Sequence, residues 1–229
     1  MSEVLTHPAV LADGEVVLRN VNKVYQTRSG PHAVLSDLNL TIRRGDSLGI
    51  MGRNGAGKST LTRIITGVET PTSGTVERTM KVSWPLGFFG AVQASLSGAD
   101  NTRFIARIYG APIEETLRSV EAFAELGRYF RMPVKTYSSG MMARLAFGLS
   151  LAVDFDCYVI DEVTGVGDHR FAERCQEALF ARRATGALIM ISHNIETLKI
   201  YCDRGAILCS GKLIFFDTLE ETYEAYHAL

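Results

Sequence analysis

The sequence predicts an α/β fold in which a mainly parallel sheet is covered by helices on both faces. Short apolar runs that resemble buried strands alternate with helix-like runs along most of the chain, which is typical of parallel sheets. A glycine-rich stretch, 52–60, lies between one such strand and one such helix. Three successive helix-like runs between residues 101 and 151 interrupt the alternation. We therefore expect a helical subdomain inserted into the sheet domain.

Apolar alternation and short apolar runs predict the strands, and apolar residues spaced three and four apart predict the helices. The expected strands are 15–25, 33–42, 47–51, 75–77, 81–84, 157–160, 187–191 and a hairpin of 206–209 with 212–216. The expected helices are 61–66, 101–109, 113–126, 141–151, 170–183, 195–202 and 219–228, with Ser138 or Ser139 as the N-cap of the fourth. Residues 26–32 and 71–74 are expected to be turns, and 85–98, which has no clear period, a mobile connector.

Composition places the chain among ordinary globular proteins. It has 229 residues, of which 46% are apolar and 21% charged, and this length indicates one domain with a sizeable core. A net charge of −1 gives no reason to expect a nucleic-acid partner. Since no apolar run is long enough to span a membrane and the N-terminus lacks a signal-peptide pattern, we expect a cytoplasmic protein. The four cysteines have no metal-binding spacing and are expected to be reduced and mostly core residues.

Residues 52–60 match the phosphate-binding loop pattern, with Gly52, Gly57, Lys58 and Ser59 at its four fixed places. Glycines let successive backbone N–H groups point into one concavity, and the helix N-terminus behind them favours an anion. Lys58 would reach the outer phosphates and the Ser59 hydroxyl a Mg²⁺ ion. The predicted ATP-binding residues are Gly52, Arg53, Asn54, Gly55, Ala56, Gly57, Lys58, Ser59 and Thr60. A glycine-rich turn that binds nothing is disfavoured by the strand and helix on either side.

Two acids follow the apolar strand 157–160, as Mg-nucleotide chemistry requires. We predict that Asp161 binds Mg²⁺ and that Glu162 is the general base. The carboxyl ends of neighbouring strands meet at one edge of an α/β sheet, so His193, which follows strand 187–191, is a candidate sensor of the terminal phosphate. A solvated acidic loop and a histidine without function are the alternatives.

Tyr137 to Met141, with the sequence YSSGM, resembles the signature motif of ATP-binding-cassette (ABC) proteins. Other positions of the family follow in order along the chain. The resemblance implies that Tyr25 is the adenine platform and that Gln93, in the Q-loop, contacts ATP and Mg²⁺. It also implies that Asp168 lies in the D-loop and that His193 is the switch residue. The match runs from about residue 15 to 226. The resemblance implies a single ATP-binding domain, 1–229, of the P-loop NTPase type. Residues 15–85 and 155–218 would form its RecA-like sheet with an N-terminal antiparallel β subdomain. Residues 99–153 would form a helical signature subdomain, and 219–229 a C-terminal helix.

Residues 83–85, 135–141 and 161–168 more narrowly resemble the ATPase subunits of bacterial capsular-polysaccharide exporters. This resemblance implies a head-to-tail homodimer in which Ser139 and Gly140 of one subunit close over ATP bound to the other. It also implies docking of a membrane permease beside segment 84–103, at the cytoplasmic face of the inner membrane, to export a lipid-linked polysaccharide. Trp84, Phe88 and Phe89 fit a core position equally well. Met141 and Met142 depart from the commonest signature, so the hydrolysis rate does not follow from the motif.

Several alternatives stay open. Teichoic-acid and O-antigen exporters use related ATPases, although the chain ends at Leu229 without the carbohydrate-binding domain of many O-antigen subunits. A cassette ATPase acting on DNA or ribosomes is disfavoured by the absence of a coiled-coil insertion or a tandem cassette. A P-loop kinase is disfavoured by the signature motif and by Glu162 following Asp161.

Overall fold

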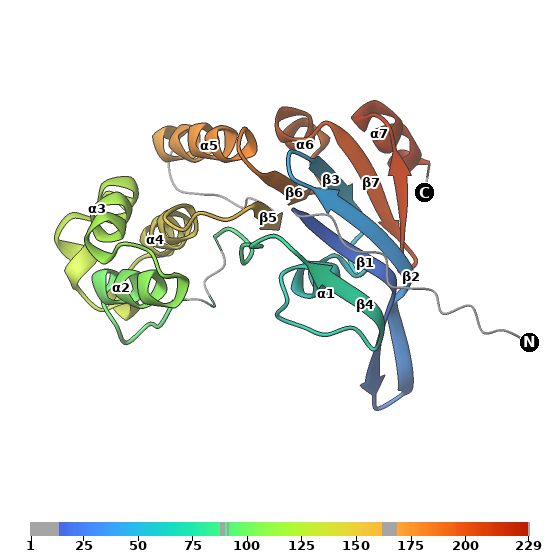
Figure 1. Ribbon diagram of the computed structural model, residues 1–229, viewed down its shortest axis with the longest axis horizontal. Helices are drawn as coiled ribbons and strands as arrows, with labels where there is room; N and C mark the ends of the chain where they lie inside the picture. The colour runs from blue at the N-terminus through green and yellow to red at the C-terminus, as the bar shows by residue number, and fades with distance from the viewer. Residues whose placement is uncertain (1–13, 88–89, 91, 162–168, 229) are drawn as a thin grey trace, which may run out of the picture.

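The computed structural model describes residues 14–87, 90, 92–161 and 169–228, which form two sheets and a set of helices (Figure 1). The first sheet is antiparallel, in the order β2-β1-β4. Its strands are β1 (Glu15–Thr27), β2 (Gly30–Arg43) and β4 (Ser73–Arg78). The hairpin of β1 and β2 reverses more tightly than the predicted turn 26–32, because both strands continue to Thr27 and Gly30. The expected N-terminal antiparallel β subdomain is confirmed.

The second sheet has the order β5-β6-β3-β7-β8. Its strands are β3 (Ser47–Met51), β5 (Cys157–Asp161), β6 (Ala187–Ile191), β7 (Arg204–Cys209) and β8 (Lys212–Phe216). Strands β5, β6, β3 and β7 pair in parallel, and β7 forms the predicted antiparallel hairpin with β8. The mainly parallel sheet is confirmed.

The two faces of the parallel sheet pack into two different cores. On β6, Leu188 and Met190 face a core shared with the helices, whereas Ile189 and Ile191 face a core shared with the antiparallel sheet and helix α1 (Lys58–Ile65). Because both faces are covered, β3 and β6 are buried along their whole length, which explains their continuous apolar sequences.

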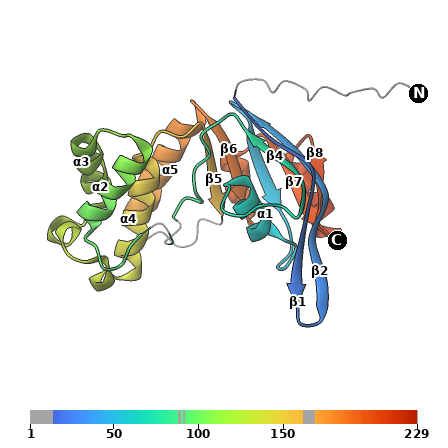
Figure 2. The same ribbon diagram turned by 60° about the horizontal axis from the view of Figure 1, so that its bottom comes forward.

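Three further helices cover the face of this sheet opposite α1. They are α5 (His169–Arg183), α6 (Ile195–Tyr201) and α7 (Leu219–His227) (Figure 1). Figure 2 shows α5 and α1 on opposite sides of β5. Helix α6 approaches β3 closely because Gly49 has no side chain; a Cβ there would lie 3.2 Å from the methyl groups of Leu198. Helix α7 packs on β7 over another glycine, Gly205, against which Thr222 is seated.

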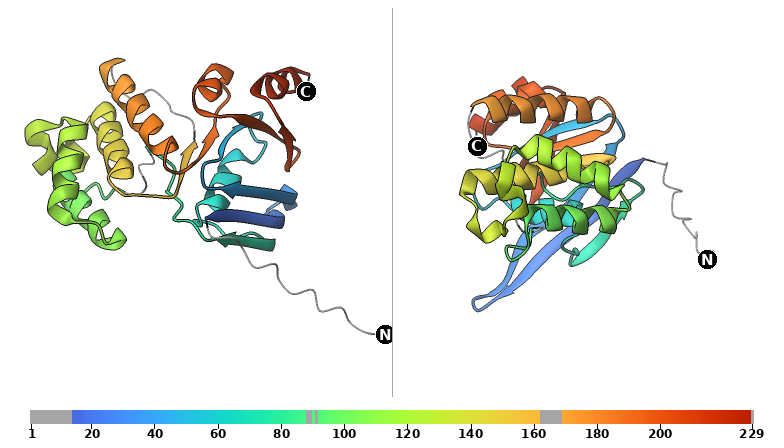
Figure 3. Two further views of the ribbon diagram at one scale, coloured as in Figure 1. Left: turned by 45° about the horizontal axis from the view of Figure 1, so that its top comes forward. Right: turned by 90° about the vertical axis from the view of Figure 1, so that its left-hand side faces the viewer.

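A separate group of helices lies at one end of the molecule (Figure 3). It contains α2 (Gly98–Tyr109), α3 (Ile113–Ala124) and α4 (Ser139–Leu151), with α3 packed against both of the others. Two short 3₁₀ helices that the sequence pattern does not predict, Gly127–Arg131 and Val134–Thr136, connect α3 to α4. The inserted helical subdomain is confirmed.

The predicted strand 81–84 is wrong, since this segment makes only a single parallel bridge, between Val82 and Cys157. Beyond that bridge, the backbone N–H of Val159 donates to the side-chain oxygen of Ser83 at 2.9 Å instead of to a strand carbonyl. Pro85 follows and has no N–H to donate. The segment therefore runs beside β5 without forming a regular ladder.

The connector 85–98 follows a more fixed course, over its described part, than the absence of a period predicts. Asn101, on α2, accepts from the backbone N–H of Gln93 at 2.7 Å and donates to its carbonyl at 3.1 Å. The carbonyls of Ala94 and Leu96 accept from residues 135 and 134. Asn101 is buried, and these bonds tie the connector to the helical group.

No helix in the described ranges is both long and apolar enough to cross a membrane.

Three of the four cysteines are buried, as predicted, and we expect them to be unreactive in the folded protein. Burial raises the pKa of the Cys157, Cys175 and Cys202 thiols to about 12. At pH 8 only about one in 10⁴ of such thiols is ionised, whereas Cys209 is only half-buried. Labelling with Ellman's reagent should therefore show one fast thiol per native chain and four after denaturation. A Cys209→Ser variant should lose the fast phase, and several fast thiols in the native chain would contradict the buried positions.

Candidate nucleotide site

The phosphate-binding loop connects β3 to α1, as the sequence predicts. Gly57 is the N-cap of α1 with φ 104°, and Gly55 has φ 82°, values that side chains disfavour. Gly52 is required for a different reason, because a Cβ there would lie 2.8 Å from the carbonyl oxygen of Leu208. These glycines keep the loop close to the sheet and leave the first turn of α1 available to an anion.

Lys58 folds back across the loop. Its Nζ donates to the carbonyl oxygen of Gly52 at 2.6 Å and to that of Arg53 at 3.1 Å. The ammonium group is therefore held at the loop, where it can neutralise a bound phosphate. Ser59 and Thr60 follow in the first turn of α1.

Tyr25, near the end of β1, lies against the first turns of α1. Its hydroxyl oxygen is 3.3 Å from Oγ1 of Thr60, two residues after Lys58. The structure thus brings the predicted adenine platform next to the helix that follows the phosphate loop, although 35 residues separate Tyr25 from Thr60 in sequence.

The carboxyl ends of β5, β6 and β3 meet at one edge of the sheet. Asp161 is paired with Ile191, and the backbone N–H of Ser192 donates to the carbonyl of Ile50 at 3.2 Å. His193 follows and lines a cavity of about 570 Å³ together with Gly52, Arg53, Asn54 and Tyr226. His193 and the phosphate loop therefore line one cavity. Glu162 and Asp168, also predicted as site residues, lie outside the described residues.

Two residues of this region were missed by the sequence reasoning. Tyr226, on α7, reaches the cavity beside the phosphate loop, but a half-buried tyrosine near the end of a helix carries no signal of such a position. Asn101 fixes the backbone of Gln93 from eight residues away. Asn101 and Thr102 are the two polar side chains among the residues that α2 buries, and nothing local in the sequence distinguishes Asn101 as a contact of Gln93.

The signature segment lies on a different part of the molecule. Ser138 is the N-cap of α4, with its Oγ accepting from the backbone N–H of Met141 at 3.2 Å. In the first turn, Ser139 is exposed and Gly140 is half-buried. In the described part of the chain, Ser138 and Gly140 line a second cavity, of about 380 Å³, in the helical group. The structure does not bring Ser139 or Gly140 to the phosphate loop of the same chain.

The fold and this site define a P-loop ATPase of the ABC type, and the chain belongs to the ABC transporter family, whose model matches residues 35–165. It is 51% identical to the capsule polysaccharide export ATP-binding protein CtrD of Neisseria meningitidis serogroup B, over 93% of this chain and 99% of CtrD. It is also 51% identical to the ATP-binding protein BexA of Haemophilus influenzae, over 92% of this chain and 97% of BexA.

A solved structure supports the fold. It is the dimeric structure of the ATP-binding cassette MJ0796 in a post-hydrolysis state, bound to ADP and Pi. This structure superimposes on the present chain with a TM-score of 0.78, and the superposition covers 89% of this chain and 98% of the MJ0796 chain. The two sequences are 22% identical, so this similarity concerns the fold.

Proposed function

We propose that this chain is the ATP-hydrolysing subunit of an exporter of a capsular or related surface polysaccharide. The observation that carries the proposal is the 51% identity to CtrD across almost the whole of both chains. The protein would work at the cytoplasmic face of a bacterial inner membrane, as a peripheral partner of a membrane permease. A lipid-linked polysaccharide would be the cargo, without contacting this subunit.

The phosphate groups of ATP would occupy the loop from Gly52 to Thr60, with the base stacked on Tyr25. Lys58 would exchange its contacts to the loop carbonyls for phosphate oxygens, since its ammonium group already lies there. His193 would contact the terminal phosphate, a role supported by its position with Arg53 and Asn54 around one cavity.

The residues proposed for Mg²⁺ fit that ion by their chemistry. Ser59, Asp161 and Gln93 offer a hydroxyl, a carboxylate and an amide oxygen, and Mg²⁺ prefers oxygen ligands. When bound, the ion would neutralise charge on the transferred phosphoryl group. Glu162 would accept the proton of the attacking water, as the sequence predicts.

The complete site would require a second copy of the chain. Ser139 and Gly140 are in the first turn of α4, where Ser139 is exposed, and they do not line the cavity formed by the phosphate loop and His193. A helix N-terminus with exposed donors is suited to the triphosphate of a partner subunit. The solved structure of MJ0796 is a dimer with ADP and Pi bound. We propose a head-to-tail homodimer closed by ATP, with Asp168 at the contact.

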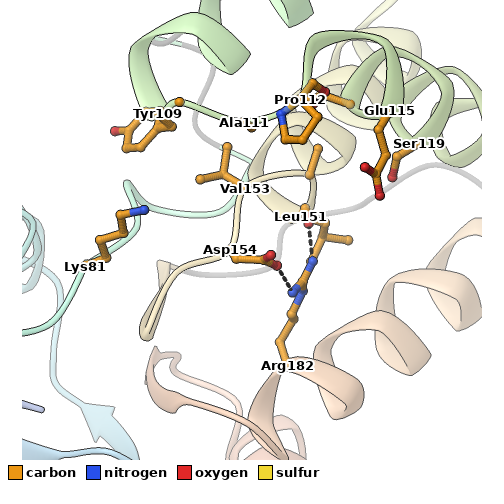
Figure 4. Close-up of a pocket in the computed structure, with 13 residues that line it drawn as sticks. Lys81, Tyr109, Ala111, Pro112, Glu115, Ser119, Leu151, Val153, Asp154 and Arg182 are labelled. Atoms are coloured by element: carbon orange, nitrogen blue, oxygen red, sulfur yellow. Dashed lines mark hydrogen bonds and ion pairs between the residues drawn. The ribbon is translucent and has the colours of Figure 1, made fainter.

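The permease would dock where the helical group meets the sheets. A cleft of about 440 Å³ lies there, between the α2–α3 connection, the end of α4 and Arg182 on α5 (Figure 4). Tyr109, at its edge, packs against Trp84 with ring centroids 5.4 Å apart. The cleft therefore lies next to Trp84, which directly precedes the connector that contains Gln93. Trp84 itself packs on Phe155 and donates to Ser150, which favours its core interpretation.

A bulky side chain in this cleft should block the permease without affecting the ATP site. We expect Ala111→Trp to lower the amount of permease captured by the tagged subunit about tenfold, because the indole would fill the space that the partner needs. ATP hydrolysis by the isolated subunit should stay unchanged. Ser29→Trp, at the exposed tip of the β1–β2 hairpin, is the matched control. Unchanged capture by the Ala111 variant would exclude this cleft as the docking site.

The cargo can be tested in reconstituted membranes containing the subunit and its permease. We expect lipid-linked capsular polysaccharide to stimulate ATP hydrolysis and a teichoic-acid or O-antigen precursor to leave the rate unchanged. A teichoic-acid exporter is the alternative, but the teichoic acids export protein TagH of Staphylococcus haemolyticus is only 36% identical to this chain. Stimulation by the teichoic-acid precursor alone would reverse this assignment.

A further inference from the structure

A cluster of polar and charged side chains surrounds the hydroxyl group of Tyr25. Lys23 and Tyr25 come from β1, Thr60 and Arg63 from α1, and Glu69 from the loop between α1 and β4. These residues are brought together by the fold, since Glu69 is 44 positions from Tyr25. The cluster lies beside the nucleotide site, but the proposed chemistry does not use Lys23, Arg63 or Glu69.

Glu69 is the centre of this cluster. One carboxylate oxygen pairs with Nζ of Lys23 at 2.8 Å, and the other accepts from Nε of Arg63 at 2.8 Å and from the Tyr25 hydroxyl at 2.9 Å. The backbone N–H of Glu69 also donates to the carbonyl of Arg63 at 3.1 Å. Only 21% of the Glu69 side chain and 14% of that of Lys23 are exposed, so this pair differs from an ordinary surface ion pair, whereas 45% of the Arg63 side chain is exposed.

The contacts hold the tyrosine ring at its hydroxyl end and near one face. The hydroxyl donates to Glu69, receives a hydrogen bond from Nη2 of Arg63 at 3.1 Å and is near Thr60. A phenol has one donor and two acceptor positions, so its hydrogen-bonding capacity is used. The ammonium of Lys23 lies 5.1 Å from the ring centroid. Rotation of the Tyr25 side chain would break several of these contacts together.

The carboxylate of Glu69 keeps its charge in this environment. Partial burial raises its pKa, but the hydrogen bonds from Lys23, Arg63 and Tyr25 outweigh that effect and bring the pKa to about 2. The hydrogen bond to Glu69 in turn raises the pKa of Arg63. Glu69 is therefore ionised at neutral pH and accepts strongly from the tyrosine hydroxyl.

We propose that Glu69 is a positioning residue for the nucleotide, which holds the hydroxyl of Tyr25 and so fixes the ring on which the base of ATP stacks. This inference rests on the proposed role of Tyr25 as the base platform. Stacking of a base on an aromatic side chain contributes about five- to 150-fold in affinity. A ring that must first be ordered loses part of that contribution, because the ordering entropy is then lost on binding.

Binding to the full-length protein separates this role from a merely structural one. Isothermal titration calorimetry with ATP and with inorganic tripolyphosphate, which has no base, should be done on Glu69→Gln, Tyr25→Phe and the double variant. We expect Glu69→Gln to weaken ATP about three- to tenfold and to leave tripolyphosphate unchanged, since only the base uses the ring. Tyr25→Phe should weaken ATP similarly, and the double variant no further, because both changes remove the same hydrogen bond, from the tyrosine hydroxyl to a charged carboxylate. In ATP hydrolysis, KM should rise and kcat stay constant.

Glu77→Gln, on β4 of the same sheet, is the matched control for loss of one negative charge and should bind ATP normally. Equal weakening of ATP and tripolyphosphate by Glu69→Gln would mean that Glu69 only supports α1, and would overturn the proposal. Unchanged ATP affinity in Glu69→Gln would also overturn it. The Tyr25→Ala variant tests the assumption that the base of ATP stacks on Tyr25. If that variant binds ATP as tightly as the natural chain, then the platform role of Tyr25 fails and the role of Glu69 fails with it.

Discussion

Replacement of Glu162 by glutamine is expected to lower ATP turnover by about 10²- to 10⁴-fold while ATP binding is retained, the usual range for loss of a general base. Glutamine has nearly the same shape as glutamate but cannot accept the proton of the attacking water at neutral pH. The prediction comes from the sequence, in which Glu162 directly follows Asp161. Asp161 ends β5 at the sheet edge where Ser192 and His193 follow the end of the neighbouring strand, β6.

Turnover should be measured with saturating Mg-ATP on the purified chain, and binding with a fluorescent ATP analogue. Glu177→Gln, at an exposed position of α5, removes the same charge away from the sheet edge and should hydrolyse ATP normally. Hydrolysis by the Glu162 variant at the natural rate would remove this residue from the role of general base. Loss of binding together with turnover would instead indicate a contribution to holding the nucleotide.

The sequence predicts those parts of the site that depend on local patterns. The phosphate loop can be identified because its pattern is contiguous in sequence and Gly57 has a positive φ angle, and Asp161 because a buried strand ends there. The order of strands and helices follows from periodicity, since the parallel strands are buried on both faces. These features need no knowledge of which segments meet in space.

The rest of the site depends on contacts between distant segments. Glu69 and Tyr226 approach the nucleotide site only through the packing of the β4 loop and of α7, and neither belongs to a local pattern. The irregular course of residues 81–86 depends on a hydrogen bond from β5 to Ser83, 76 residues away. The strand prediction failed there because a side chain replaced a backbone acceptor, a choice that local propensity does not reveal.

The second substitution with a large expected effect is in the signature turn, the first turn of α4, which contains Ser139 and Gly140. We expect Ser139→Arg to abolish ATP-dependent dimer formation when it is combined with Glu162→Gln, which should otherwise accumulate the ATP-bound dimer. The first turn of α4, where Ser139 is exposed, would meet the phosphate loop of the partner, and a guanidinium group there leaves no room for close approach. The monomer should still bind ATP, because Ser139 does not line the cavity at its own phosphate loop.

The structure also indicates why this substitution is a clean test. Ser138, not Ser139, caps α4 through its bond to the N–H of Met141, so the helix should keep its start in the Ser139 variant. Size-exclusion chromatography with light scattering should give a dimer for Glu162→Gln with ATP and a monomer for the double variant. Ser29→Arg in the same background adds the same side chain at the hairpin tip and should leave the dimer intact. If the Ser139→Arg double variant dimerises normally with ATP, then the two subunits do not meet through the signature turn, and the head-to-tail arrangement is wrong.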